Sequence, residues 1–380
     1  MYRHKFFYDN NDIPQVQYEK VLKAILDHRC NRPSHDYKRL QKHGVAGLLI
    51  NPEDSLSSIS LQQPPRVTPR QGTALYQARL CEDTFESIAL SLAEGVGVSA
   101  TSRIQKTDKK TVLRTLTKAG THAQKVSRSF LLNIKVTECQ LDEMWSFVGK
   151  KEKNLSTFEK LQQVLGDAWI WIAFDAVNKI VPAYVVGKRT LPNAVALLEN
   201  VKKRTAGIPE LFSSDQLDHS ANALLQVYGE TVQPRRKPGP GRPPGPILVP
   251  PKNLNYVHVV KQYKQNRVFK VTHKVVFGDP EKIKDILNKS VVSRKINTSY
   301  VERYNGTVRH IDARCSRKTY RFSKIKRNHE YQLALSIAYY HLCKPQRTLT
   351  KRCRKPTTPF MAAGLTDHIW SMKELLEYKP

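Results

Sequence analysis

The chain has 380 residues, enough for two or three domains of ordinary size. Its 63 Lys and Arg against 33 Asp and Glu give a formal net charge of +30, and its 40% hydrophobic content excludes a wholly disordered chain. The charge indicates a polyanionic partner. Nucleic acid is favoured over a membrane, because the most apolar run, residues 169–174, is far shorter than the ~20 residues of a spanning helix.

Residues 1–75 form an N-terminal region of unclear fold, whereas residues 76–128 predict a helix-turn-helix DNA-binding domain. Apolar spacing predicts one helix ended by Gly95, a short second helix after Gly97, and a third ended by Gly120. The residues near the start of the third helix, where side chains reach base edges or phosphates, are Lys109, Lys110, Thr111 and Arg114. An ordinary three-helix unit with a solvated basic face is the alternative, and the net charge favours DNA binding.

Residues 129–345 predict a mixed α/β domain. Alternating and continuous apolar runs indicate strands over 134–149, 167–176 and 180–190, with a hairpin turn at 175–180 between the last two. A helix over 191–207, a strand over 210–216 and a helix over 219–229 follow. Past residue 254 we expect a strand near 268–277, a short helix near 280–287 and long helices over 297–343, then a basic C-terminal tail over 346–380.

A proline-rich basic linker interrupts this domain at residues 234–251, where eight of the chain's 22 prolines lie. Within it, Gly-Arg-Pro at 241–243 resembles the core of an AT-hook, in which an arginine enters a narrow minor groove. Arg242 is therefore a candidate DNA contact, and a plain charged linker is the favoured alternative.

Three carboxylates in apolar settings stand out against the basic background. Asp142 lies within the first strand, Asp215 ends the strand over 210–216, and Glu302 lies one turn into a late helix. Oxygen ligands of this kind bind Mg²⁺ or Mn²⁺, and two such ions can activate an attacking oxygen and stabilise a leaving one. On the helix of Glu302, Asn305 and Arg309 share its face, which adds groups suited to phosphate.

Each carboxylate also has a structural interpretation. Glu143 adjoins Asp142, and a one-residue slip of the strand would exchange their roles. Asp215 could cap the following helix, and Ser299 with Glu302 has the spacing of a capping box. The residues alone leave these alternatives open.

The motifs resemble those of bacterial or archaeal insertion-sequence DDE transposases of the IS-one kind. The resemblance covers residues 70–345 and is carried by QLDEMWSFVGKK, GDAWIWIAFDAVNKIVPAYVVGKRT, FSSDQ and YVERYNGTVRH, in that order. Relatives often carry an N-terminal cysteine zinc ribbon, whereas this chain has no CxxC pair. For this family the implied catalytic domain is RNase H-like, a mixed sheet flanked by helices, with Asp142, Asp215 and Glu302 as catalytic residues that hold two Mg²⁺ or Mn²⁺ ions.

The resemblance implies a transposase that binds terminal inverted repeats of double-stranded DNA and catalyses strand cleavage and strand transfer. Arg303, Asn305 and Arg309 would position phosphates. Paired DNA ends imply a homodimer or a larger synaptic assembly, without a membrane partner, in the cytoplasm at the nucleoid. The alternative function is a non-catalytic, decayed or domesticated, DNA-binding protein.

Overall fold

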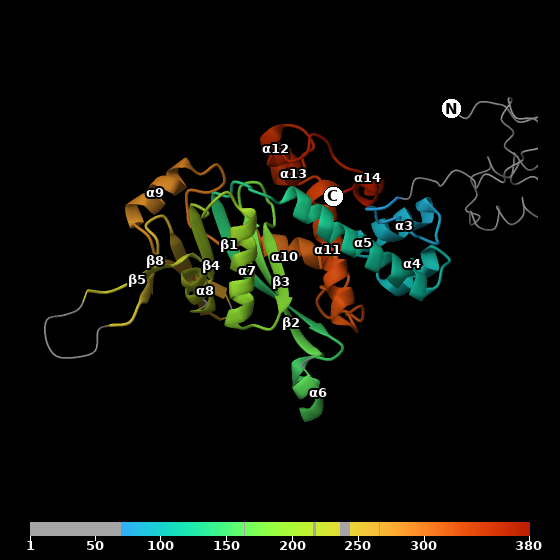
Figure 1. The fold of residues 1–380 in the computed structure, drawn as a ribbon, viewed down its shortest axis with the longest axis horizontal. Helices are drawn as coiled ribbons and strands as arrows, with labels where there is room; N and C mark the ends of the chain where they lie inside the picture. Colours follow the sequence, from blue (N-terminus) through green and yellow to red (C-terminus); the bar gives the residue numbers. More distant parts are fainter. Residues whose placement is uncertain (1–69, 163, 216–217, 236–243, 266) are drawn as a thin grey trace, which may run out of the picture.

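A six-stranded sheet forms the centre of the molecule in the computed structural model, which describes residues 70–380 except 163, 216–217, 236–243 and 266. The strand order is β3-β2-β1-β4-β7-β8. Figure 1 shows the sheet with helices packed around it. The strands β1, β4 and β7 are parallel neighbours, and the remaining pairs are antiparallel. Their bounds are β1 Glu138–Val148, β2 Gly166–Asp175, β3 Ala183–Gly187, β4 Leu211–Asp215, β7 Tyr256–Lys264 and β8 Arg267–Phe277. The mixed α/β prediction is confirmed.

Helices cover both faces of the sheet. On one face, α7 (Leu191–Arg204) and α8 (Asp218–Tyr228) pack on residues such as Leu141 and Trp171. On the other face, Met144 and Ile170 pack with residues of α10 (Ser299–Ile311) and α11 (Lys326–Leu342), and α9 (Pro280–Lys289) lies against β7. Since successive strand residues point to opposite faces, Asp142 faces α10 and Glu143 faces α7. No helix among the described residues is both long and apolar enough to span a bilayer.

Three helices precede the sheet, as predicted: α3 (Glu82–Ala93), α4 (Val98–Ile104) and α5 (Lys109–Phe130). The prediction that Gly120 ends the third helix is wrong, because α5 continues for ten further residues through Phe130. Gly120 lies instead where α11 crosses α5, and a Cβ atom there would be 2.6 Å from both the Cβ and the carbonyl oxygen of Tyr331. Apolar residues of α3, α5 and the sheet belong to one continuous buried cluster, so these helices are fixed against the α/β region.

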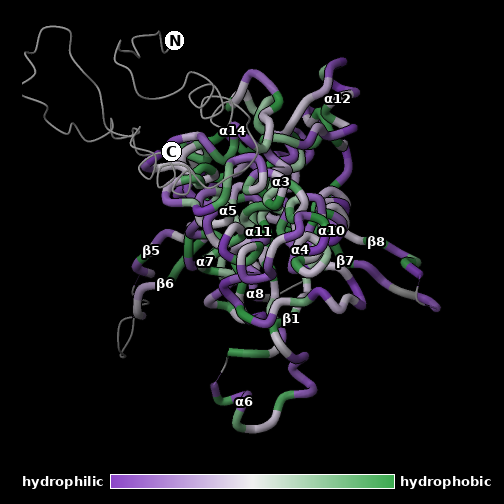
Figure 2. The backbone as a smooth tube through the Cα atoms, turned by 90° about the vertical axis from the view of Figure 1, so that its right-hand side faces the viewer, coloured by the Kyte–Doolittle hydropathy of each residue, from purple (hydrophilic) through white to green (hydrophobic). Residues whose placement is uncertain are grey.

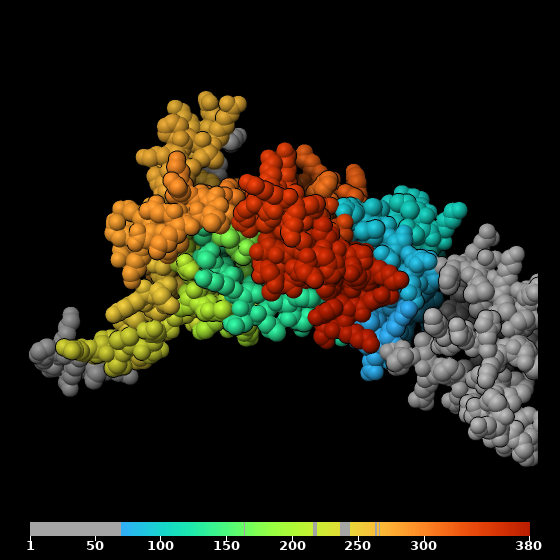
Figure 3. Space-filling view, turned by 90° about the horizontal axis from the view of Figure 1, so that it is seen from above, coloured from blue at the N-terminus to red at the C-terminus, as the bar shows by residue number. Residues whose placement is uncertain are grey.

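The segment predicted as a basic tail also joins the core. It forms α12 (Arg347–Cys353), α13 (Pro359–Ala362) and α14 (Met372–Glu377), with Phe360 and Leu375 fully buried. Figure 3 shows these C-terminal helices lying against the helices that precede the sheet, and α14 contacts α3 and α5. The many basic residues of this segment predicted an exposed tail, but its apolar side chains are part of the core.

Two further segments differ from expectation. Part of the predicted linker pairs as a small ribbon, β5 (Glu230–Val232) with β6 (Ile247–Val249), whereas Arg242 lies outside the described residues. Between β1 and β2, a 3-10 turn (η1, Glu152–Asn154) and α6 (Thr157–Gln162) form an extension. Figure 2 shows α6 and β8 projecting from the body of the molecule. Residues 1–69 also lie outside the described part of the chain.

Replacing Gly120 with Ala should destabilise the fold. Alanine is the better helix former by ~1 kcal/mol, but overpacking against a neighbouring backbone costs ~1–3 kcal/mol, so we expect a net loss of up to about 2 kcal/mol. Gly306→Ala in α10 is the matched control, since a Cβ atom at residue 306 would meet no atom within 4 Å and only the helix-propensity gain applies. Urea denaturation of both variants would measure the difference, and equal stabilisation of both would contradict the close crossing.

Candidate active site

Asp142 lies within β1 and turns its carboxylate toward α10. The side-chain amide of Asn305 donates a hydrogen bond to Asp142 Oδ2 (2.6 Å), and the backbone N–H of Glu143 donates one to Oδ1 (2.9 Å). Burial raises the pKa of Asp142 to about 7, and the negative charges of Glu143, Asp215 and Glu302 add to that rise. The charges of Asp215 and Glu302 therefore act on Asp142 although the three residues come from distant parts of the chain.

Glu143 belongs to the opposite face of the sheet. Its carboxylate lies 3.5 Å from the guanidinium of Arg189, which also stacks on the ring of Trp169 at 4.8 Å. Burial raises the pKa of Glu143, and the charge of Arg189 opposes that rise. The pairing of Asp142 with Ile172 in β2 sets the strand register, so of the two neighbouring acids it is Asp142 that shares the α10 side of the sheet with Glu302.

Asp215 and Glu302 meet at the end of β4 and the first turn of α10. The Thr298 hydroxyl bridges them, 2.9 Å from Asp215 Oδ1 and 3.1 Å from Glu302 Oε1. Ser299 does not form the capping box considered from the sequence, because its hydroxyl donates to Asn297 Oδ1 (2.7 Å) and the Glu302 carboxylate faces Thr298. About half of each carboxylate side chain is exposed, 49% for Asp215 and 47% for Glu302.

Lys261 is a site residue that the sequence patterns did not single out. Its ammonium donates to both Asp215 oxygens (2.9 and 3.0 Å), to the Thr298 hydroxyl (3.0 Å) and to Glu302 Oε1. Burial would lower the pKa of Lys261, but hydrogen bonds with Glu302 and Asp215 outweigh it and raise that pKa. The signal was present in the alternation of β7, which puts Lys261 on the same face as buried residues Val257 and Val259.

The predicted phosphate-binding residues differ in position. Asn305 is buried beside Asp142, and Arg309 is half-buried, with Nη1 donating to the Cys315 carbonyl (3.2 Å). Burial lowers the pKa of Arg309. Arg303 is exposed on α10 and takes part in none of the hydrogen bonds of the carboxylates described above.

Between Ile311 and Leu342, every lysine and arginine except Arg314 is exposed. Arg314 is buried, where it lies beside Asp312 and donates to the Ser323 hydroxyl (3.1 Å). The basic residues that remain exposed there are Arg317, Lys318, Arg321, Lys324, Lys326 and Arg327. At the start of α5, Lys109, Lys110 and Arg114 are exposed and Thr111 is half-buried.

The oxygen atoms around Asp142 and Asp215 suit a hard divalent cation. Carboxylate, hydroxyl and amide oxygens are the groups that Mg²⁺ and Mn²⁺ prefer, and the amide oxygen of Asn305 is buried without a hydrogen-bond donor. The position between Asp215 and Glu302 already holds a positive charge, the Lys261 ammonium. In this arrangement, the described residues include no group of three or more His, Cys, Asp or Glu side chains placed to hold one ion.

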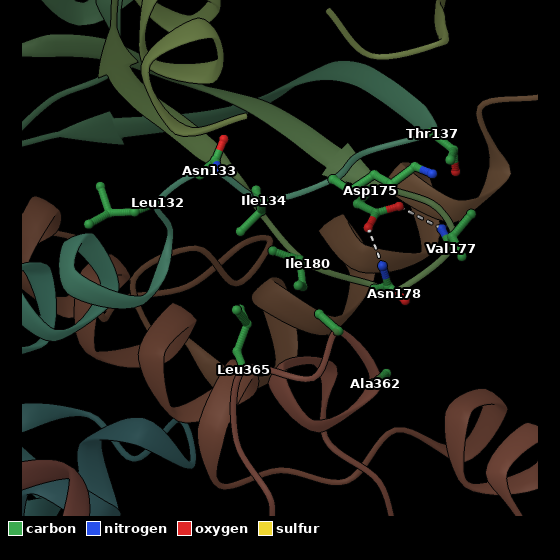
Figure 4. A pocket seen from close by; sticks show the side chains of 12 residues that line it. Leu132, Asn133, Ile134, Thr137, Asp175, Val177, Asn178, Ile180, Ala362 and Leu365 are labelled. Atoms are coloured by element: carbon green, nitrogen blue, oxygen red, sulfur yellow. Dashed lines mark hydrogen bonds between the residues drawn. The ribbon is translucent and has the colours of Figure 1, made fainter. Parts of the chain in front are cut away.

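A cavity of about 420 Å³ lies apart from this site, and none of the three carboxylates lines it (Figure 4). Asp175 lies in the wall of this cavity, and its carboxylate accepts hydrogen bonds from the Val177 N–H (2.9 Å) and the Asn178 amide (3.0 Å). The turn that the sequence predicted at 175–180 is thus held by Asp175, which is 1% exposed. Burial raises the pKa of Asp175 to about 6.

Stability should depend on pH through Asp175. The folded state holds its proton more tightly than the unfolded state, so the stability contributed is present below about pH 4 and lost as pH rises to about 6. Asp175→Asn cannot titrate, and from pH 4 to pH 7 it should lose about 2–3 kcal/mol less unfolding free energy than the wild type, measured by urea denaturation. Asp312, whose pKa burial also raises to about 6, titrates in both proteins. If the unfolding free energies of Asp175→Asn and the wild type change with pH in parallel, Asp175 does not contribute to the pH dependence of stability.

A scan against protein-family models matches none of them, and a search of the curated proteins finds no match to this chain. The chemistry of the site therefore has to be inferred from its own residues.

Proposed function

We propose that the chain is a DDE transposase of the IS-one kind, which binds double-stranded DNA at the ends of a mobile element and cuts and joins its strands. The placement of three carboxylates carries the proposal. Asp215 and Glu302 share the Thr298 hydroxyl, and Asp142 lies on the strand next to that of Asp215, where Asn305 of α10 donates to it. The sheet supports it, because the order β3-β2-β1-β4-β7 with β1, β4 and β7 parallel fits an RNase H-like catalytic domain.

The three carboxylates, with the Asn305 amide oxygen, would hold Mg²⁺ or Mn²⁺. The resemblance to DDE transposases implies two such ions. Ions of this kind lower the pKa of bound water and offset charge on a phosphate under attack. In the proposed reaction, water attacks the phosphodiester at an element end, breaks its P–O3′ bond and leaves a 3′-hydroxyl and a 5′-phosphate. The 3′-hydroxyl then attacks a target phosphodiester in line, and the target strand's 3′-hydroxyl leaves. Asn305 fixes the orientation of Asp142. Arg309 is near enough to act on Asp142 electrostatically, and in the proposed complex it would bind a DNA phosphate.

The helices α3, α4 and α5 supply the second part of the proposal, a helix-turn-helix. The connection from α4 to α5 is short, and the exposed basic residues at the start of α5 suit contacts with phosphates or base edges. Paired DNA ends would require a homodimer or a larger synaptic assembly.

The alternative function is a DNA-binding protein without catalysis. One observation favours it: a lysine ammonium occupies the space between Asp215 and Glu302.

Amide substitutions at the three carboxylates should abolish the chemistry. Asp142→Asn, Asp215→Asn and Glu302→Gln nearly preserve shape but remove the charge that attracts divalent cations. Each should eliminate Mg²⁺-dependent cleavage and strand transfer on a plasmid that carries the gene's flanking DNA, while binding of that DNA persists.

Glu143→Gln and Asp175→Asn are the matched controls for these variants. Glu143 is paired with Arg189 on the other sheet face and Asp175 holds a turn, so both variants should keep cleavage within about tenfold, roughly 1.4 kcal/mol of barrier. Active Asp142→Asn protein together with inactive Glu143→Gln protein would overturn the assignment, and cleavage by all three triad variants would reject the enzyme altogether.

DNA binding should depend on the adjacent lysines at the start of α5. Each lysine that no longer neutralises a phosphate should lower the slope of log affinity against log salt by ~0.9, so Lys109→Gln with Lys110→Gln should lower it by up to ~1.8. The control removes the same charge from the exposed pair Lys202 and Lys203 on α7. Fluorescence anisotropy with duplex DNA across a salt series measures the slopes. Equal effects of the two double variants would exclude α5 as the contact.

A further inference from the structure

A lysine side chain reaches into the acidic half of the site. Lys261 extends from β7, and its ammonium contacts four oxygen atoms, which belong to Asp215, Thr298 and Glu302. The Lys261 side chain is only 17% exposed, less than either carboxylate partner. Four oxygen neighbours around one positive charge resemble the surroundings of a bound cation more than those of a surface ion pair.

The fold makes this contact specific to Lys261. In β7, Val257 and Val259 are buried on the face toward α9 and α10, and Lys261 is the next residue on that face. Asp215 pairs in register with Val259, so the lysine stem needs to extend only a short way back along the strand to reach it. An inward-facing lysine without anionic partners would carry a large desolvation cost.

The other half of the site has a different set of partners. Asp142 accepts from Asn305 and from the Glu143 backbone, and Lys261 does not contact it. The amide oxygen of Asn305, a residue 8% exposed, has no hydrogen-bond donor although it is buried beside Asp142. That unpartnered acceptor is a second, independent sign that the site takes a cation that the side chains themselves do not supply.

We infer that the Lys261 ammonium is a resident cation between Asp215 and Glu302, and that a divalent ion binds those two carboxylates only by displacing it. The inference rests on the proposed function for the identity of the ion. Two carboxylates balance one divalent ion in charge, whereas one ammonium leaves the pair with a net charge of −1. The flexible lysine stem lets the ammonium move to solvent without a change in the strand.

Metal binding to Lys261→Gln tests the displacement directly. Without divalent ions, the variant should melt below the wild type because Asp215 and Glu302 then repel each other. Isothermal titration calorimetry with Mn²⁺ should show at least tenfold tighter binding than in the wild type, with the same number of ions at saturation. Mn²⁺ should also raise the melting temperature of the variant more than that of the wild type.

Lys264→Gln is the matched control, an exposed lysine on the same strand, and it should behave like the wild type. A Lys261→Gln protein that is destabilised and gains no affinity for Mn²⁺ would show a purely structural ion pair. A wild type that binds fewer ions than Lys261→Gln at saturation would show that the ammonium stays in place. Either result overturns the inference.

A measurement on the wild type covers the case in which Lys261→Gln does not fold. With ¹⁵N-labelled lysine, the ammonium signal absent from Lys261→Arg identifies Lys261 in the NMR spectrum. Mg²⁺ should shift that signal and speed its proton exchange with water, and an unchanged signal at saturating Mg²⁺ would overturn the inference. Cleavage with an unmoved Lys261 signal contradicts only the displacement, whereas displacement without any cleavage contradicts only the proposed enzyme.

Discussion

Like-charge repulsion among three carboxylates is the constraint on which the arrangement of this site depends. Burial raises the pKa of Asp142, and the negative charges of Glu143, Asp215 and Glu302 add to that rise. The surroundings offset this cost in different ways: Asn305 donates to Asp142, and Thr298 and Lys261 lie between the other two. Glu143, a fourth acid close in sequence, is turned to the far face and paired with Arg189.

Sequence patterns located the carboxylates because strand alternation and helix spacing are local properties. Asp142 within β1, Asp215 at the end of β4 and Glu302 in the first turn of α10 all lie in the predicted kinds of element. The partners of these acids were harder to find. Lys261 comes from β7, a strand in which valines are mixed with lysine, glutamine and tyrosine, so that its apolar face is not obvious from the sequence. The contact of Lys261 with Asp215 also depends on the order of the strands in the sheet.

Long-range packing explains the other differences between expectation and structure. From the local sequence, a glycine in a helical pattern predicts the end of the helix. Gly120 lies within α5 instead, and α11 passes so close to it that a side chain at this position would not fit. Likewise, basic residues dominate the composition of 346–380, whereas Phe360 and Leu375 determine where that segment lies. In each case a few contacts with distant elements outweigh the average character of the local sequence.

The close crossing at Gly120 has a mechanical consequence. The backbone of α5 packs directly on α11 at Gly120, and α3 also contacts α11. The helix with the exposed lysines therefore cannot move independently of the sheet that carries Asp142. If a subunit binds one DNA duplex through α5 and cuts it at the carboxylates, as proposed, the number of base pairs between the bound site and the cut phosphate has a fixed value. Inserting or deleting base pairs within that interval would then rotate the scissile bond around the duplex axis and away from the carboxylates.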